Sequence, residues 1–252
     1  MGIGAISRLD QNSGCVHLIG VVTALRAEAS CIVSARIPFN ESVRINAHSV
    51  VWLSGMGASA AQRAAKELCQ HGVTALVSFG VAGALDPSLK PGDLVLPDAI
   101  YADQQWPVNL VWRDRLQQKL AMDVTVVNGV LANSAEPLTD EKTKQALAQA
   151  TGACAVDMES AAIAAVAATA HIPFIAVRAI IDPVQFSPPQ ALLSAVYPDG
   201  SVNPVRIMTL LLNRSVHFST LIQMGAGMRA ARKTLSRVIQ LAGSGMASQI
   251  PD

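Results

Sequence analysis

The chain has 252 residues, of which 51% are hydrophobic and 15% charged, and its formal net charge is +1. This length allows one large domain or two small ones with a sizeable core. The near-neutral charge argues against nucleic acid as a partner, because phosphate backbones require clustered positive charge. No apolar run approaches the ~18–20 residues of a membrane span. We expect no secretory signal, since residues 1–14 lack a basic segment followed by an apolar one.

The first half of the chain predicts strands and helices in alternation. The apolar run 17–25 is typical of a buried strand, and residues 43–55 predict one or two strands before a glycine turn. Residues 56–72 have helical composition, with Gly72 placed to end the helix. Residues 74–96 predict a strand, a glycine loop and a second strand.

The pattern continues to residue 182. Helical segments near 112–122 and 139–150 flank a strand near 124–131, and a helix at 158–171 precedes a strand at 174–182. This alternation predicts an α/β domain in which helices cover both faces of a sheet.

The last part of the chain differs. Residues after Pro183 are rich in proline and turns, and Pro188–Pro189 predicts the start of a helix. Residues 205–241 have a helical pattern of Leu, Ile and Met against arginines and a lysine. Such a basic amphipathic helix either lies on a membrane surface or packs on the core with a solvated basic face.

Acidic residues mark both ends of the last helix–strand unit. A 14-residue helix rises about 21 Å and a nine-residue strand spans about 27–30 Å. Because Pro173 turns the chain back, we expect Glu159 and Asp182 to share one edge. Glu28 follows the strand at 17–25 and reaches the same edge, where open α/β sheets bind ligands.

Each acid also has an ordinary structural interpretation. Asp157 or Glu159 can complement a helix N-terminus, Asp182 before a proline can start a turn, and Glu28 can be a solvated helix residue. Spacing alone therefore names no reaction. The widely scattered cysteines have no metal-ligand spacing, so we expect no metal and free thiols in a reducing cytoplasm.

Four motifs in order resemble the nucleoside phosphorylase / methylthioadenosine–adenosylhomocysteine nucleosidase superfamily. They are GVVTALRAEAS, SGMGASAAQRAA, SFGVAGALDPSLKPGDLVLPD and AVDMESAAIA with IPFIAVRAIIDP, between residues 17 and 183. The resemblance implies a three-layer αβα fold of the nucleoside phosphorylase type, with a central mixed sheet and C-terminal helices. It implies a single domain at 15–241 with tails at 1–14 and 242–252.

The C-terminal third, from DPVQFSPPQ to SVHFSTLI, resembles the hopanoid-associated phosphorylase branch. That branch is linked to the removal of adenine from adenosylhopane in bacterial hopanoid synthesis. The resemblance implies a lipid-linked nucleoside substrate and a lipid-facing role for the helical part at 183–241. It also implies a cytoplasmic homo-oligomer, dimeric or larger, with peripheral contact to the inner membrane.

The resemblance also assigns roles to residues. Asp182 matches the acid at purine N7, Glu159 the glutamate that holds ribose hydroxyls, Met158 the methionine under the sugar, and Glu28 the carboxylate that activates water. Such carboxylates suit an oxocarbenium-like transition state and a leaving base that needs a proton. We expect Arg178 to pair with buried carboxylates of the sheet. The other expected substrate-binding residues are Asp157, Val81, Ala82, Gly83, Pro137, Leu138 and Arg26.

The chain departs from the family pattern at several positions. Val81 replaces a serine that binds phosphate or sugar, Ser78 replaces a phosphate-binding arginine, Pro137 replaces the purine-stacking phenylalanine, and Ile181 replaces a serine beside the acid. Arg26 still matches another phosphate-binding arginine. We therefore favour water over phosphate as the nucleophile, keep phosphate as a candidate co-substrate, and expect no other cofactor.

These observations predict an N-glycosidase or a pentosyltransferase. The first hypothesis is release of adenine from adenosylhopane. The alternatives are a phosphate-dependent purine nucleoside phosphorylase and a methylthioadenosine/adenosylhomocysteine nucleosidase. A non-catalytic binding protein is a third class, favoured by Val81, Pro137 and Ile181 and opposed by the retention of the three acids.

Overall fold

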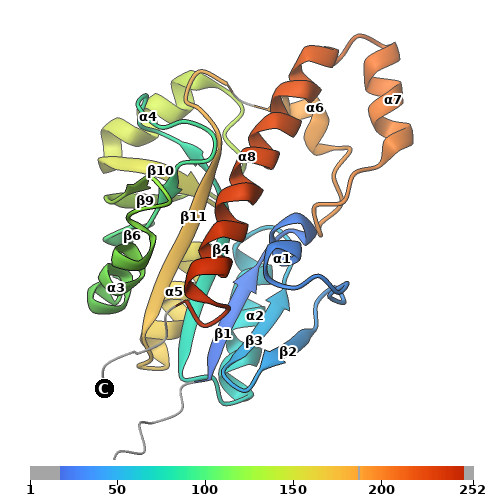
Figure 1. Cartoon of the computed structure of the whole chain (residues 1–252). Helices are drawn as coiled ribbons and strands as arrows, with labels where there is room; N and C mark the ends of the chain where they lie inside the picture. The colour runs from blue at the N-terminus through green and yellow to red at the C-terminus, as the bar shows by residue number, and fades with distance from the viewer. Residues whose placement is uncertain (1–17, 187, 247–252) are drawn as a thin grey trace, which may run out of the picture.

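A computed structural model describes residues 18–186 and 188–246 (Figure 1). The expected tail at 1–14 and most of the tail at 242–252 lie outside this part of the chain. The described residues build one eleven-stranded mixed sheet with helices on both faces. In chain order, the strands are β1 (Ile19–Thr23), β2 (Ser42–Asn46), β3 (Ser49–Leu53), β4 (Ala75–Ala84), β5 (Leu94–Val95), β6 (Ala99–Tyr101), β7 (Gln105–Pro107), β8 (Val126–Val127), β9 (Val130–Asn133), β10 (Ala153–Asp157) and β11 (Phe174–Asp182).

The helices form two layers around this sheet. They are α1 (Arg26–Ile32), α2 (Ala58–Gln70), α3 (Leu110–Leu120), α4 (Glu141–Thr151), α5 (Ser160–Thr169), α6 (Gln190–Leu193), α7 (Pro204–Leu212) and α8 (Phe218–Ala242). One apolar core lies beneath α2 and α5, and the other beneath α1, α3 and α8. The expected three-layer αβα architecture with C-terminal helices is confirmed.

Strand β4 organises the sheet. β11 pairs with it in parallel along one edge, from Leu76 to Gly83. The opposite edge is shared, because β1 pairs in parallel with Ala75–Ser78 and β10 pairs antiparallel with Gly83–Ala84. Within the described structure, residues 79–82 therefore have no strand partner on this edge. Their backbone groups are free to bind side chains or a ligand.

In the helix–strand unit α5–β11, the helix is shorter than the sequence pattern predicts. The strand is confirmed at 174–182, but the helix expected at 158–171 spans only Ser160–Thr169. It begins late because the Asp157 carboxylate accepts hydrogen bonds from the backbone N–H groups of Glu159 and Ser160. Ten helical residues rise about 15 Å. The end of the longer β11 therefore projects beyond the start of α5.

The sequence pattern missed three strands, β6, β7 and β10. It also predicted one helical run at 205–241, whereas the structure has two helices that are separated near Arg214, whose φ is 53°. The second of them crosses the front of the sheet (Figure 1). Its buried residues are Gly227, Ala231, Leu235 and Val238. None of the helices in the described ranges is long and apolar enough to cross a bilayer.

Helix α8 contacts the end of β11 through a glycine. A β-carbon at Gly227 would lie 2.0 Å from the backbone oxygen of Ile181, a distance at which something must shift. A β-carbon at Gly225, one half-turn earlier, would meet nothing within 4 Å. The close approach of this helix to the strand end that carries Asp182 therefore requires glycine at position 227.

The two glycines provide a matched pair of variants. We expect Gly227→Ala to lower the free energy of unfolding by about 1–3 kcal/mol, because the new methyl group overpacks the contact. Gly225→Ala should raise it by roughly 0.5–1 kcal/mol, since alanine is the better helix former and the site is open. Urea unfolding of the three proteins measures both changes. Equal effects at the two positions would contradict the contact at Ile181.

Candidate active site

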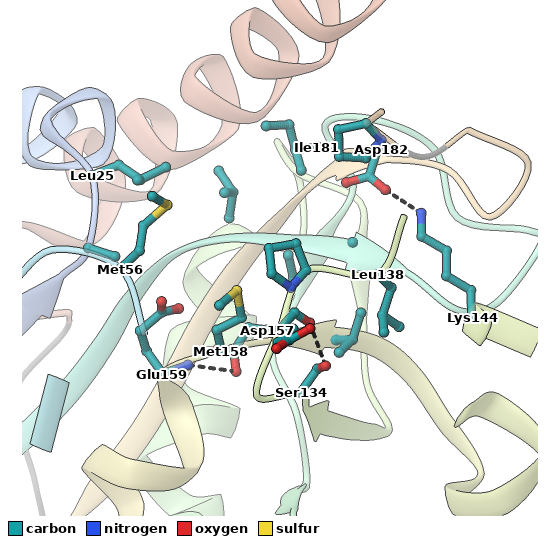
Figure 2. Close-up of a pocket in the computed structure, with 18 of the residues that line it drawn as sticks. Leu25, Met56, Ser134, Leu138, Lys144, Asp157, Met158, Glu159, Ile181 and Asp182 are labelled. Carbon is teal, nitrogen blue, oxygen red and sulfur yellow. Dashed lines mark hydrogen bonds and ion pairs between the residues drawn. The ribbon is translucent and has the colours of Figure 1, made fainter. Parts of the chain in front are cut away.

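A pocket of about 220 Å³ opens where β4 has no strand partner on its β1 and β10 edge. Ten of the eleven site residues expected from the sequence line it; Arg26 does not. Figure 2 shows Glu159, Met158 and Asp157 at one end, and Asp182 with Lys144 at the other. The lining residues are Ala24, Leu25, Glu28, Met56, Val81, Ala82, Gly83, Ser134, Glu136, Pro137, Leu138, Lys144, Val156, Asp157, Met158, Glu159, Ile181, Asp182 and Pro188.

Glu28 joins the end of β1 to the free edge of β4. It lies in the first turn of α1 and is 1% exposed. One carboxylate oxygen accepts from the backbone N–H groups of Ala24 and Leu25, both at 2.9 Å, and the other accepts from that of Val81 at 2.9 Å. Burial raises the pKa of Glu28, while the Arg178 guanidinium and the three amides oppose that rise.

Arg178 lies in the centre of the sheet and neutralises buried carboxylates. Its Nη2 atom is 2.7 Å from Oδ2 of Asp157 and 4.0 Å from Oε2 of Glu159. The expected pairing of this arginine with buried acids is confirmed. Glu159 also accepts a 2.7 Å hydrogen bond from the backbone N–H of Gly57. Burial raises the pKa of Glu159 to about 7 against the opposing effect of Arg178, and Asp157 adds to the rise.

Two small residues of β4 make this arrangement possible. A β-carbon at Gly80 would lie 2.4 Å from Oε1 of Glu28 and 2.5 Å from Nη1 of Arg178, so only glycine lets both groups approach the strand. Ser78 accepts a hydrogen bond from Nη2 of Arg178. Ser160 donates a hydrogen bond to the Ser78 hydroxyl. The side chain at position 78 thus binds the Arg178 guanidinium.

Asp182 occupies the other end of the pocket. A register shift between Ile180 and Asp182 interrupts the pairing of β11 with β4, and such irregularities redirect side chains near active sites. Its carboxylate pairs with the Lys144 ammonium. Burial raises the pKa of Asp182, and Lys144 opposes the rise.

Sequence reasoning missed Lys144. It is 1% exposed and lies on the inner face of α4, the face that also carries Leu147, Ala148 and Thr151. The helical periodicity of that face was the available signal, because a lysine among inward-facing positions needs a buried partner. Among the described residues that line the pocket, this lysine is the single cation.

Arg26 does not face the pocket. Its guanidinium pairs with Asp199 and donates to the backbone oxygen of Ile37 at 3.0 Å. The loop that carries Asp199 also accepts backbone hydrogen bonds from Arg26 and Met56 through its own carbonyl groups. The arginine thus anchors the start of the C-terminal helical part beside the pocket.

Glu28 and Asp182 lie against different positions along β4. Gly80 lies against Glu28, and a β-carbon at Gly83 would lie 3.4 Å from Oδ2 of Asp182. Three strand residues span roughly 10 Å at ~3.3 Å each. The positions of β4 against which Glu28 and Asp182 lie are thus about 10 Å apart along the strand.

The model of the family described as "Phosphorylase superfamily" matches residues 41–193, more than half of the chain. The chain belongs to the phosphorylase superfamily. This superfamily member is also 26% identical, over 185 residues, to a 5′-methylthioadenosine/S-adenosylhomocysteine nucleosidase of Mycobacterium bovis, covering 56% of this chain and 72% of that protein.

Solved structures show the same fold. A 5′-methylthioadenosine/S-adenosylhomocysteine nucleosidase of Helicobacter pylori has a TM-score of 0.67 and 16% identity, covering 93% of this chain and 99% of that one. Futalosine hydrolase of the same organism has a TM-score of 0.68 at the same identity and coverage. The expected enzyme class, N-glycosidase or pentosyltransferase, is confirmed at the level of the superfamily by the family match and the curated nucleosidase relatives.

The pKa of Glu159 predicts a pH dependence of stability. Between its ordinary value of 4.5 and about 7, the folded protein binds more protons than the unfolded chain, so this carboxyl makes stability fall as pH rises through that window. Glutamine does not titrate and can still accept from Gly57. Between pH 5 and pH 8, we therefore expect the unfolding free energy of the wild type to fall by up to about 3 kcal/mol relative to that of Glu159→Gln. Urea unfolding at both pH values measures this change. Exposed Glu41 supplies the control variant Glu41→Gln, and a pH-independent difference for Glu159→Gln would contradict the raised pKa.

Proposed function

We propose that this superfamily member is an N-glycosidase that hydrolyses the ribosyl–adenine bond of an adenine nucleoside. The observation that carries the proposal is the convergence of Glu28, Glu159 and Asp182, from three separate segments, on one pocket. Its two curated nucleosidase relatives support the same reaction class.

In the proposed mechanism, the acids at one end of the pocket act on the sugar and the attacking water, and the acid at the other end acts on the base. Breaking the glycosidic bond places positive charge on the sugar and negative charge on the purine. Glu159 holds the ribose hydroxyls and stabilises the oxocarbenium-like sugar. Asp182, whose pKa burial raises, delivers a proton to N7 of the departing base. Glu28 orients and deprotonates the attacking water.

Several features support water rather than phosphate as the nucleophile. A phosphate dianion is usually held by arginine side chains or several backbone donors. Arg26 is paired with Asp199, Ser78 stands in place of an arginine, and Lys144 is the single cation among the described lining residues. The backbone N–H of Val81 is engaged by Glu28. Phosphorolysis is therefore the second candidate, and phosphate is not assigned a binding site.

An adenine-release assay tests the proposal. We expect the purified protein to release adenine from an adenine nucleoside at a rate independent of added phosphate. Asp182→Asn should lower kcat by at least about 100-fold, because the base then leaves without a positioned acid. Exposed Asp103 supplies the control variant Asp103→Asn, which should keep full activity.

The outcomes separate the three function classes. A rate that requires phosphate, with ribose 1-phosphate as a product, would favour a phosphorylase. Calorimetric binding of adenine without turnover of any tested nucleoside would favour a binding protein. Full activity in Asp182→Asn would remove Asp182 from the role of acid.

We further propose that the 5′ substituent is lipid-like, as in adenosylhopane, and that the C-terminal helices contact a membrane. Apolar side chains are exposed on α7 and on the first turns of α8, and Figure 1 shows this part projecting beyond the sheet. They are Val205, Met208, Leu212, Phe218 and Ile222. Between Gly200 and Met246 the sequence has six arginines and lysines and no acid, which favours anionic lipid headgroups.

A second copy of the chain is the other candidate partner for this apolar surface, since a homo-oligomer is also expected from the sequence. The methylthioadenosine/adenosylhomocysteine nucleosidase alternative is favoured by the relatives and requires no lipid. The release assay distinguishes these substrates. Adenosylhopane in vesicles with anionic lipid should react faster than in zwitterionic vesicles and faster than methylthioadenosine. Turnover of methylthioadenosine or adenosylhomocysteine alone would assign the nucleosidase alternative.

A further inference from the structure

Lys144 makes every hydrogen bond that an ammonium group can donate. Its Nζ atom donates to Oδ2 of Asp182, to the backbone oxygen of Pro183 at 3.0 Å and to that of Phe186 at 2.9 Å. An ammonium has three N–H donors, so none remains for a substrate. The lysine is therefore held as a fixed positive charge behind the carboxylate, although it lines the pocket.

A buried lysine is costly unless an ionised partner and hydrogen bonds compensate for its lost hydration. At 1% exposure, Lys144 depends on Asp182 for that partner. Among the described residues, no second cation forms an ion pair with Asp182. Lys144 and Asp182 thus form an ion pair of their own, apart from the one that Arg178 forms with Asp157.

The contact also fixes the direction of the carboxyl group. Within the described structure, Asp182 receives its side-chain hydrogen bond at Oδ2, from Lys144, and Oδ1 receives none. The same lysine holds the two carbonyl groups of the segment that leaves β11. It thereby fixes both the acid and the chain that follows it.

We propose that Lys144 is the positioning residue of Asp182, which holds Oδ2 so that Oδ1 faces the departing base and which stabilises the carboxylate that remains after proton transfer. This inference rests on the proposed N-glycosidase function. As the C1′–N9 bond breaks, its electron pair passes to the purine, the proton on Oδ1 passes to N7, and Asp182 becomes an anion beside the ammonium. Water adds hydroxide to C1′ and gives its second proton to Glu28, and exchange with solvent restores both carboxyl groups.

The physical consequence is a stronger acid. Burial alone raises the pKa of Asp182, and Lys144 opposes that rise. A carboxyl group whose pKa is far above the working pH transfers its proton poorly to the base. Lys144 therefore makes the protonated form of Asp182, the form that the proposed step requires, a stronger acid than burial alone would leave it.

The test compares Lys144→Gln, Lys144→Arg and the control Lys142→Gln, which changes an exposed lysine of the same helix. Glutamine can still donate to the two carbonyl groups but lacks the charge. We expect Lys144→Gln to lower kcat by about 10–100-fold. The alkaline limb of its kcat–pH profile should shift upward by at least about one pH unit, because an opposite charge typically lowers a carboxyl pKa by 1–3 units. Lys144→Arg keeps the charge and should leave the limb near its wild-type position, and Lys142→Gln should match the wild type.

A carbon-13 NMR titration of Asp182 in wild type and Lys144→Gln gives a readout that does not need turnover, so it separates failure of this inference from failure of the proposed function. We expect a higher Asp182 pKa in the variant. A lower kcat with an unmoved limb and an unmoved titration would reduce Lys144 to a structural role and overturn the proposal. If Lys144→Gln does not fold, Lys144→Arg provides the test. A shift of about one unit in the alkaline limb of its kcat–pH profile, despite the retained charge, would also overturn the proposal.

Discussion

The pairing of one buried guanidinium with several carboxylates is the interaction on which the site depends. Arg178 is 2% exposed in the centre of β11, 2.7 Å from Asp157, and it lowers the pKa of both Glu28 and Glu159 against the effect of their burial. These acids come from two separate segments of the chain, one that carries Glu28 and one that carries Asp157 and Glu159. Without the guanidinium, their mutual repulsion and lost hydration would oppose folding. The positive charge of Arg178 thus allows several carboxylates to be buried beside the pocket.

The topology of the sheet places that cluster beside a cavity. β1 and β10 share one edge of β4 and leave residues 79–82 unpaired between them. The N–H of Val81 is consequently available to Glu28, and Gly80 leaves room for Glu28 and Arg178 together. At the far end of the gap, Asp182 has its own counter-ion in Lys144. The pocket therefore has two electrostatically separate ends, which a reaction that separates charge between sugar and base requires.

Sequence patterns predicted much of this arrangement. The strand 174–182 and the position of Glu28 just after β1 followed from apolar runs and their polar ends. The pairing of Arg178 with buried acids was expected at a position matched through the family resemblance. The strand at Ala153–Asp157 was missed because five residues directly after a helix give too short a pattern. Lys144 was missed because its partner lies 38 residues away, and Arg26 was misplaced because its partner Asp199 lies 173 residues away. Spacing along the chain does not encode such contacts.

A crystal structure of the protein with a non-hydrolysable adenine nucleoside analogue tests the roles of the three acids most directly. We predict that N7 of the base lies within hydrogen-bond distance of Asp182, that the ribose hydroxyls contact Glu159, and that a water lies between Glu28 and C1′. A nucleoside bound outside this pocket, or one whose ribose lies at the Lys144 end, would contradict the assignment of the two ends and with it the proposed glycosidic cleavage.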